Sequence, residues 1–326
     1  MNRNQYAEML KEIHETRVSG GDVTACIAKY CERYKFAYLY NDSVFRMFFG
    51  NPEYVKWTID FLNAAIKLDG PDCISELTFV DPSLPGGPFS KEIRSDLVAE
   101  DPEHNRIVLE VQHKGSSDFP DRIVYYTSKH TAASKLPGDV YKLRDLNFVV
   151  LQMFDAYSDS KRYRHEVCFR NEDGKRYFDK QTLILVELQK FYDNSYKADN
   201  SPLAQWLRAI EFVNNENEGA LAGNPYVEVL QKFAKLSNFS IDFFLSEAKD
   251  MVDREYELSI ERREARKEGL AEGRAEGLAE GRAEGLAEGR AEGRAEGLSA
   301  TLEAMRKLGV PEEKIREAEA LLKANA

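Results

Sequence analysis

Alternating apolar and polar positions divide the first two thirds of the chain into helices and strands. Apolar residues recur at helical spacing from about Asn4 to Arg17, and again in the segment "YVKWTIDFLNAAIK". Alternation with a period of two predicts strands at Ile93–Glu100 and Arg106–Gln112, joined by the loop "DPEHN". The helical spacing returns at about Asp121–Lys135. This part of the chain is therefore expected to combine helices with a sheet.

Two continuous apolar runs, "NFVVLQMF" and "TLILVELQKF", have the length and composition of strands that are buried on both faces. The segment "RHEVCFRNEDGKRYF" predicts a hairpin that turns across Asn171–Gly174. From about Leu203 onward the pattern is helical only. Strands mixed with helices, followed by helices alone, favour one α/β domain with an α-helical C-terminal extension.

A four-residue repeat, E-G-(L/R)-A, extends from Glu268 to Gly297. Each step advances a side chain by about 40° around a helix, so that the glycine row spirals around the axis. An interior glycine costs about 1 kcal/mol relative to alanine, and eight would cost about 8 kcal/mol. The repeat therefore either packs its glycines closely against another helix, in a homodimer, or frays as a spacer. Beyond it we expect two short helices, with Gly309 ending the first and Pro311 starting the second.

Composition supports a folded body: hydrophobic residues make up 43% of the 326 residues. No apolar run reaches the roughly 18–20 residues that cross a bilayer, and the charged N-terminus does not resemble a signal peptide. A cytoplasmic protein without membrane partners is therefore expected. The cysteines and histidines are scattered, which argues against a disulfide framework and a His/Cys zinc site.

Charge is distributed unevenly along the chain. The net charge of −11 argues against nucleic-acid binding driven by charge over the whole surface. Between Asp121 and His165, however, eight Lys and Arg residues stand against five Asp residues, a local balance of +3. This stretch is either a basic patch or a solvated helix face.

The strand "IVLEVQHKG" carries Glu110 and Gln112 side by side on one face. If Ile93–Glu100 and Arg106–Gln112 form an antiparallel hairpin, the numbers of cross-strand partners sum to 206. Asp96 then opposes Glu110, and Arg94 opposes Gln112. Like charges directly opposite each other destabilise a sheet, unless one carboxylate takes up a proton or a cation lies between them.

A divalent cation would remove this repulsion, because hard ions such as Mg²⁺ prefer carboxylate, carbonyl and water oxygens. Asp96, Glu110 and the carbonyl of Val111 could then hold the metal, and a water activated by it could attack a phosphodiester with Gln112 beside it. The alternative is an amphipathic hairpin with a solvated polar face. A second E-x-Q at Glu187 and Gln189 has no matching aspartate and is interpreted as structural.

Several segments occur in the order seen in a known family: "NDSVFRMFFGNPE", "IRSDLVAEDPEHNRIVLEVQHK", "DRIVYYTSKHTAASKLPGDVYKL" and "LVELQKF". From about Phe36 to Phe191 the chain resembles the recombination-promoting nuclease (Rpn) and transposase family of the PD-(D/E)XK nuclease superfamily. The Glu-Gly repeat is also similar to tails in that family. The resemblance implies a restriction-endonuclease-like core, a mixed central sheet flanked by helices.

The same resemblance implies that Asp96 and Glu110 bind Mg²⁺ or Mn²⁺. It places Gln112 where most of the superfamily has lysine, a departure that is common in this family. A neutral amide cannot supply positive charge to the transition state, which leaves activity open. Other cations could supply it, and Asp42 of "NDSVF" could assist the site or serve as a helix N-cap. These auxiliary candidates are Asp42, Lys91, His113, Lys114 and Arg122.

We therefore expect a nuclease-like core at residues 36–195, preceded by a helical segment at 1–35. A helical region at 196–267, the repeat at 268–298 and a helical hairpin at 299–326 are expected to follow. The expected function is a Mg²⁺-dependent DNA endonuclease that is associated with recombination or mobile elements and dimerises through its helical C-terminal region. The alternative is a catalytically inactive, oligomeric DNA-associated or partner-binding module that retains the nuclease fold.

Overall fold

The computed structural model describes residues 2–87, 90–134, 138, 142–195, 198–213 and 223–324. The chain separates into two compact units, Met1–Met251 and Val252–Ala326. The helices of the first unit are α1 (Arg3–Val18), α2 (Val23–Arg33), α3 (Asp42–Phe49), α4 (Val55–Ile66), α5 (Phe119–Ala133), α6 (Leu188–Lys190), α7 (Pro202–Phe212), α8 (Val227–Ala234) and the start of α9 (Ile241–Lys307). Its strands are β1 (Thr78–Val80), β2 (Ser83–Leu84), β3 (Ile93–Arg94), β4 (Leu97–Glu100), β5 (Arg106–Gln112), β6 (Leu146–Gln152), β7 (Arg164–Val167) and β8 (Gln181–Glu187).

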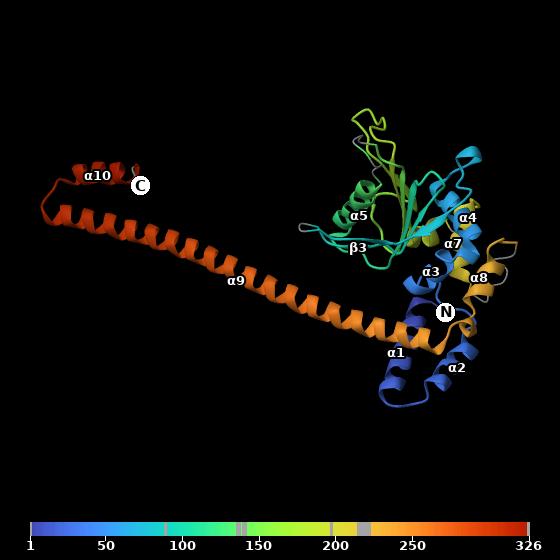
Figure 1. The fold of residues 1–326 in the computed structure, drawn as a ribbon. Coiled ribbons are helices and arrows are strands. Elements are labelled where there is room, and N and C mark those ends of the chain that lie inside the picture. The colour runs from blue at the N-terminus through green and yellow to red at the C-terminus, as the bar shows by residue number, and fades with distance from the viewer. Residues whose placement is uncertain are drawn as a thin grey trace. The chain divides into compact units, whose positions relative to one another are not determined.

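A mixed six-stranded sheet with the order β1-β4-β5-β6-β8-β7 forms the centre of this unit (Figure 1). The strands β1, β4 and β5 are antiparallel neighbours, and β7 pairs antiparallel with β8. The central strands β5, β6 and β8 are parallel, and the chain passes from β5 to β6 through α5. A parallel pair needs such a crossover. The expected mixed sheet flanked by helices is confirmed.

The two faces of the sheet contact different helices. Leu109 and Val111 of β5 belong to the larger core, which includes residues of α3, α4 and α7, whereas Val108 packs with Phe119 and Ile123 of α5. Figure 1 shows α5 on one side of the sheet and α3, α4 and α7 on the other. Because side chains alternate along a strand, positions 108, 110 and 112 share the α5 face.

The register of the predicted hairpin is confirmed from Leu97, which pairs with Leu109, to Glu100, which pairs with Arg106. The Arg106 guanidinium also lies 2.7 Å from the Glu100 carboxylate, which closes this end of the hairpin. Every cross-strand pair in this ladder sums to 206, as the sequence pattern predicts.

The prediction of one strand over Ile93–Glu100 is wrong, because the segment divides between two sheets. β3 pairs with β2 in a separate two-stranded sheet, so Arg94 opposes Ser83 rather than Gln112. The N–H of Ser95 donates to the carbonyl of Pro82 at 3.0 Å, which holds the chain on β2 before β4 begins. The residue that follows, Asp96, therefore lies between the two sheets and not inside a ladder.

The two continuous apolar runs form β6 and β8, the central parallel strands, as predicted. The predicted hairpin turn is also present, because the N–H of Asn171 donates to the carbonyl of Lys175 at 3.0 Å and that of Gly174 donates to the carbonyl of Asn171. The helix expected at Asp121–Lys135 is α5, and Lys135 lies outside the described residues.

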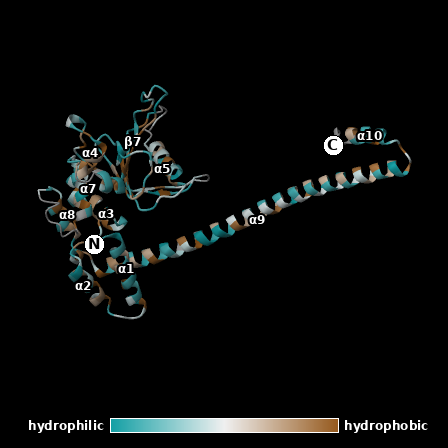
Figure 2. Ribbon diagram, turned by 180° about the vertical axis from the view of Figure 1, so that it is seen from behind, coloured by the Kyte–Doolittle hydropathy of each residue, from teal (hydrophilic) through white to brown (hydrophobic). Residues whose placement is uncertain are grey.

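In the second unit, α9 continues without a break through the whole repeat, and α10 (Glu312–Ala324) follows. The repeat is therefore helical and not frayed. A Cβ atom built on any of its eight glycines meets nothing within 4 Å, so no described part of this chain covers the glycine row. Figure 2 shows hydrophilic colours along most of this helix, with isolated apolar residues.

The first of the two short helices expected at the C-terminus is instead the end of α9, because the repeat before it is itself helical. Gly309, with a φ of +75°, follows α9, and the left-handed conformation is one that glycine adopts without strain. Pro311 then precedes α10, as expected. Within the described part of the chain, no helix combines the length and the apolarity needed to cross a membrane.

Candidate active site

The candidate site lies where β5 extends beyond the start of β4. Since β4 begins only at Leu97, the backbone of Val111 has no strand beside it on that edge. The side chain of Asp96 takes this place: the N–H of Val111 donates to Asp96 Oδ2 at 2.8 Å. The N–H and C=O of a strand residue point to the same edge, so the Val111 carbonyl also faces the side on which Asp96 lies.

Asp96 is half-buried, and burial raises the pKa of its carboxyl group. The N–H of Val111 opposes this shift, and the negative charge of Asp42 adds to it. Arg46 acts in the opposite direction as a nearby positive charge. The carboxyl group is therefore surrounded by groups of both signs.

Glu110 is the most enclosed acid of this region, with only 3% of its surface exposed. Its Oε1 atom is buried and has no hydrogen-bond partner among the described residues. Burial raises the pKa of Glu110 well above its usual value, and the charge of Asp96 raises it further. An unpartnered oxygen beside a second carboxylate is costly unless a proton or a cation binds there.

Gln112 follows on the same face and is held by α5. Arg122 Nη2 donates to Gln112 Oε1 at 2.7 Å, and the Arg122 guanidinium lies 5.7 Å from the centre of the Phe119 ring. The backbone carbonyl of Gln112 accepts from the N–H of Met153, which fixes the strand end against β6. A lysine at this position would itself carry a positive charge. The neutral amide of Gln112 is instead hydrogen-bonded to the positively charged Arg122.

Asp42 is the first residue of α3, and its Oδ1 atom lies 3.1 Å from His113 Nε2. The alternative interpretation of Asp42 as an N-cap is wrong. Asn41 is the cap, because its side chain accepts from the N–H groups of Ser43 and Val44. Asp42 instead reaches the end of β5 from the N-terminus of α3 and contributes to the charge at Asp96.

The other two cations suggested by the sequence are exposed. Lys91 lies in the β2–β3 connection, where its carbonyl accepts from the Tyr125 hydroxyl and from Lys129. Lys114 follows β5 directly. No hydrogen bond or ion pair among the described residues joins either side chain to Asp96 or Glu110, whereas Arg122 contacts the site through Gln112.

The sequence patterns do not predict a buried hydrogen bond between a serine and a histidine next to Asp96. Ser95 Oγ lies 3.0 Å from His130 Nε2, and both residues are almost fully buried. Burial lowers the pKa of His130 to about 4, and the charges of Arg106 and Lys129 add to this. The helical pattern of α5 places His130 on its inner face, but nothing in the sequence pairs it with a serine on the crossing between two sheets.

In the described part of the chain, the acids of this site are two in number, Asp96 and Glu110. No group of three or more His, Cys, Asp or Glu residues that could hold an ion occurs among the described residues. The residues present nevertheless fit a hard cation. Its ligands would be the carboxylate of Asp96, the unpartnered Oε1 atom of Glu110 and the carbonyl of Val111. Waters would complete the coordination, which is common for Mg²⁺.

The second E-x-Q lies at the end of β8. Glu187 is fully buried, and its Oε1 atom accepts from the N–H groups of Ala156 and Tyr157 at 2.6 and 3.0 Å. Its Oε2 atom forms an ion pair with Lys190. These contacts hold the β6–β7 connection and confirm the structural interpretation of this motif.

Comparison with known proteins gives one match. The family model described as PD-(D/E)XK nuclease family transposase matches residues 39–260, about two thirds of the chain. The chain belongs to this family. No curated protein and no solved structure matches it. The matched region contains α3, the hairpin, α5 and the sheet, and therefore includes the whole candidate site of this nuclease-like family member.

Proposed function

We propose that this protein is a metal-dependent DNA endonuclease that hydrolyses phosphodiester bonds at the end of β5. The observation that carries the proposal is the buried, unpartnered Oε1 atom of Glu110 beside the carboxylate of Asp96, in a chain of the PD-(D/E)XK nuclease family. Recombination or mobile-element biology is the setting in which we propose that it acts.

Asp96, Glu110 and the carbonyl of Val111 would hold the metal, with Mg²⁺ or Mn²⁺ as the proposed ion. When bound, a divalent ion lowers the pKa of a coordinated water and neutralises charge that develops on the phosphate. The N–H of Val111 orients Asp96 by donating to its Oδ2 atom. Asp42 and His113 form a polar pair close to this carboxylate.

Gln112 and Arg122 would act together in place of the lysine found in most of the superfamily. The amide oxygen of Gln112 accepts from Arg122, which leaves its NH₂ group free to donate to a water or to a phosphate oxygen. The remaining N–H groups of the guanidinium bring positive charge to the same end of the strand. This pair supplies both an orienting group and a charge.

Cleavage of plasmid DNA by the purified full chain tests the proposal. With Mg²⁺ the wild-type protein is expected to nick or linearise the plasmid, and Glu110→Gln and Asp96→Asn are expected to lose detectable cleavage. Glu103→Gln is the matched control, because Glu103 is an exposed acid in the turn of the same hairpin. Equal cleavage by wild type and both site variants would reveal a contaminating nuclease and refute the proposal.

The inactive, DNA-associated module is the second candidate function. It is favoured by the neutral side chain of Gln112 and by the lack, among the described residues, of a group of three metal-binding acids. Calorimetric titration with Mg²⁺ or Mn²⁺ separates the two functions. Binding that disappears in Glu110→Gln supports the nuclease, whereas DNA binding without any metal binding supports the inactive module.

The role of Gln112 has its own test. A Gln112→Lys substitution would place an ammonium group against Arg122, and like charges repel. We expect this single variant to cut more slowly than the wild type, and the double variant Gln112→Lys/Arg122→Gln to recover much of the loss. Steady-state cleavage rates of the four proteins form a double-mutant cycle. An increase in rate for the single variant would show that Arg122 does not supply the charge.

We also propose that two copies of the chain join through the helical C-terminal region. The support is physical: α9 contains eight glycines that cost about 8 kcal/mol, and no described residue covers them. The exposed leucines of the repeat, Leu270, Leu278 and Leu286, are available to the same contact. Deleting Gly269–Gly297 is expected to convert a dimer to a monomer in light scattering, and an unchanged mass would refute this role.

A further inference from the structure

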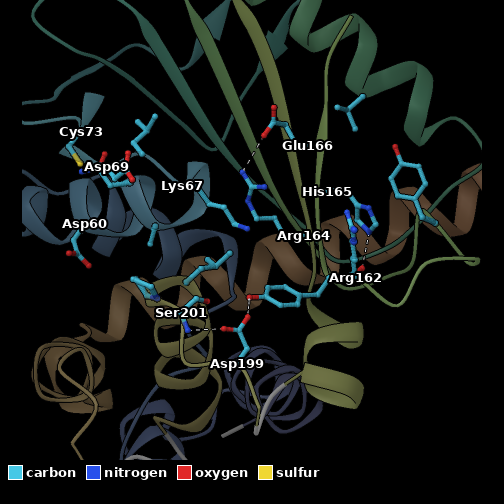
Figure 3. A pocket seen from close by; sticks show the side chains of 18 of the residues that line it. Asp60, Lys67, Asp69, Cys73, Arg162, Arg164, His165, Glu166, Asp199 and Ser201 are labelled. Carbon is cyan, nitrogen blue, oxygen red and sulfur yellow. Dashed lines mark hydrogen bonds and ion pairs between the residues drawn. The ribbon is translucent and has the colours of Figure 1, made fainter. Parts of the chain in front are cut away.

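A large cavity lies beside the edge strand β7, away from the carboxylates. It has a volume of about 1400 Å³, which exceeds the roughly 300–1,000 Å³ of typical small-molecule pockets. The end of α4, the β6–β7 connection, β7 and the start of α7 form its walls. Figure 3 shows side chains from these elements around it.

This cavity and the candidate active site share one end of the sheet. Gln112 at the end of β5 pairs with Gln152, which pairs with Glu187 at the end of β8. The N–H of Glu187 in turn donates to the carbonyl of Tyr163, in the cavity wall, at 2.7 Å. Neighbouring strands are about 4.8 Å apart, so β5 and β8 are separated by about 10 Å. The cavity walls from α4 and α7 belong to the face of the sheet opposite to Glu110 and Gln112, so a nucleic-acid strand that contacts both places would have to pass around this end of the sheet.

The acids that line the cavity are mostly engaged elsewhere. Asp60 accepts from Trp206 Nε1 at 2.7 Å, and Asp199 accepts from the Tyr163 hydroxyl at 2.5 Å and from the N–H of Ser201. Glu166 forms an ion pair with Arg176. A fourth acid, Asp69, is exposed.

The cations that line the cavity form fewer hydrogen bonds and ion pairs than its acids. No hydrogen bond or ion pair joins the side chains of Lys67, Lys161 or Arg162 to another described residue, and all three are exposed. Arg164 donates to the carbonyls of Ala65 and Ile66, and thereby caps the end of α4. Figure 3 shows Lys67, Arg162, Arg164 and Asp199 around the cavity. Lys161 and Arg162 also belong to the positive stretch of the sequence between Asp121 and His165.

Aromatic rings accompany these cations. The ring of Tyr157, whose surface is 37% exposed, lies 4.5 Å from the ring of His165, and Tyr163 is a third member of the lining. Of these rings only that of Tyr157 is exposed, since 13% of the His165 side chain is accessible and Tyr163 packs on Phe191. Positive charge beside an exposed ring is the pattern of surfaces that bind unpaired nucleotides, whose bases stack on the ring. Bases inside a duplex have both faces covered by their neighbours and cannot stack in this way.

We propose that the cavity binds an unpaired stretch of the DNA strand that flanks the scissile phosphate, so that the preferred substrate has a splayed end or a flap. This inference rests on the proposed endonuclease function. The free cations would contact the phosphates, and Tyr157, supported by the ring of His165, would stack on a base. A continuous duplex would contact the carboxylates without filling the cavity.

Binding of three labelled DNAs of one sequence to the full chain, with EDTA present to prevent cleavage, tests the inference. The probes are a blunt duplex, the single strand and a duplex with a splayed end. We expect the splayed duplex to bind about tenfold more tightly than the blunt duplex, because stacking one base contributes on the order of a tenfold change in affinity. Equal affinity for the two duplexes would overturn the inference.

Two double variants identify the surface responsible. Lys161→Ala/Arg162→Ala is expected to lose the preference for the splayed duplex and to reduce the slope of log affinity against log salt by about 1.4. The matched control is Lys11→Ala/Arg17→Ala, which removes two exposed cations of α1. A loss of preference in both double variants, or in neither, would overturn the assignment to the cavity.

The inference and the proposed function can fail separately. If the wild type prefers the splayed duplex but shows no Mg²⁺-dependent cleavage that Glu110→Gln removes, the cavity assignment stands and the endonuclease is refuted. If the protein cleaves blunt and splayed duplexes at equal rates, and Lys161→Ala/Arg162→Ala changes neither rate, the endonuclease stands and the cavity assignment is refuted.

Discussion

Two parallel strands of the central sheet end in the same short pattern, a glutamate followed two residues later by a glutamine. At the end of β8 the carboxylate of Glu187 accepts two backbone N–H groups and pairs with Lys190. At the end of β5 the carboxylate of Glu110 is also buried, and its Oε1 atom, like Oε2 of Glu187, has no hydrogen-bond partner among the described residues. Its charged neighbour is another acid instead of a lysine.

The difference lies in what the surrounding chain brings to each strand end. The β6–β7 connection brings two N–H groups to Oε1 of Glu187, and α6 adds a lysine whose positive charge lies beside Oε2, so the negative charge is compensated within the protein although Oε2 has no hydrogen-bond partner among the described residues. The crossing between β3 and β4 brings Asp96 to Glu110 instead. One strand end is therefore complete as folded, whereas the other is suited to a ligand that carries positive charge.

Replacement of Glu187 is expected to lower the free energy of unfolding more than any other substitution considered below. Glu187→Gln leaves the buried ammonium of Lys190 without a counter-charge, and breaking such a pair costs about 3–5 kcal/mol of unfolding free energy. Denaturant unfolding of the full chain measures this loss. Gln189→Ala, at the exposed end of the same motif, is the control and should change the stability by less than about 0.5 kcal/mol. A loss near zero for Glu187→Gln would contradict the structural role.

The buried pair behind the open strand end predicts a pH effect. Folding holds His130 neutral, with a pKa of about 4, while the unfolded chain has the usual value near 6.5. The resulting stability is fully present above pH 6.5 and is lost as the pH falls from 6.5 through 4, because protons then bind the unfolded chain preferentially. The loss amounts to roughly 3 kcal/mol.

Unfolding curves of wild type and His130→Gln at several pH values isolate this contribution. The substitution retains a group that can accept from Ser95 but does not titrate. The wild type should therefore lose more stability than the variant between pH 6.5 and 4. Parallel pH dependence in the two proteins would show that His130 does not titrate in this way.

The smallest expected effect has the opposite sign to that of Glu187. Without metal, Glu110→Gln removes an acid whose ionisation is opposed by burial and by the charge of Asp96, and it should raise the unfolding free energy by about 1–2 kcal/mol. Measured in EDTA, this gain would show that the site is built at a cost to stability, as functional sites often are. If Glu110→Gln is as destabilising as Glu187→Gln, the two strand ends are equivalent and the comparison fails.

Much of the core follows from the sequence for simple reasons. Alternation places Val108 and Leu109 on opposite faces, and the hairpin loop fixes the register that pairs Glu100 with Arg106. Continuous apolar runs identify β6 and β8, since strands buried on both faces cannot alternate. Glu110 can also be identified as a candidate from the sequence, because an acid is rarely buried in so apolar a strand unless it has a partner.

Other features depend on contacts between distant segments. The pattern extends one strand through Ser95, but a hydrogen bond to Pro82 assigns Ile93 and Arg94 to another sheet. Similarly, the sequence of α5 does not indicate that Arg122 donates a hydrogen bond to Gln112. These contacts join residues that are 10 or more positions apart, and local periodicity carries no information about them.

The residue pattern alone was enough to predict β5, β6 and β8 and the register of the β4–β5 hairpin, because each depends on the period of neighbouring residues. Which of the two glutamates lacks a compensating positive charge depends instead on contacts with distant segments. Both patterns are alike in sequence, and both carboxylates are buried. The distinction arises from the groups that other segments place around them, N–H groups and a lysine at Glu187 and a second carboxylate at Glu110. In a low-dielectric interior those neighbours determine whether a charge is satisfied or needs a ligand.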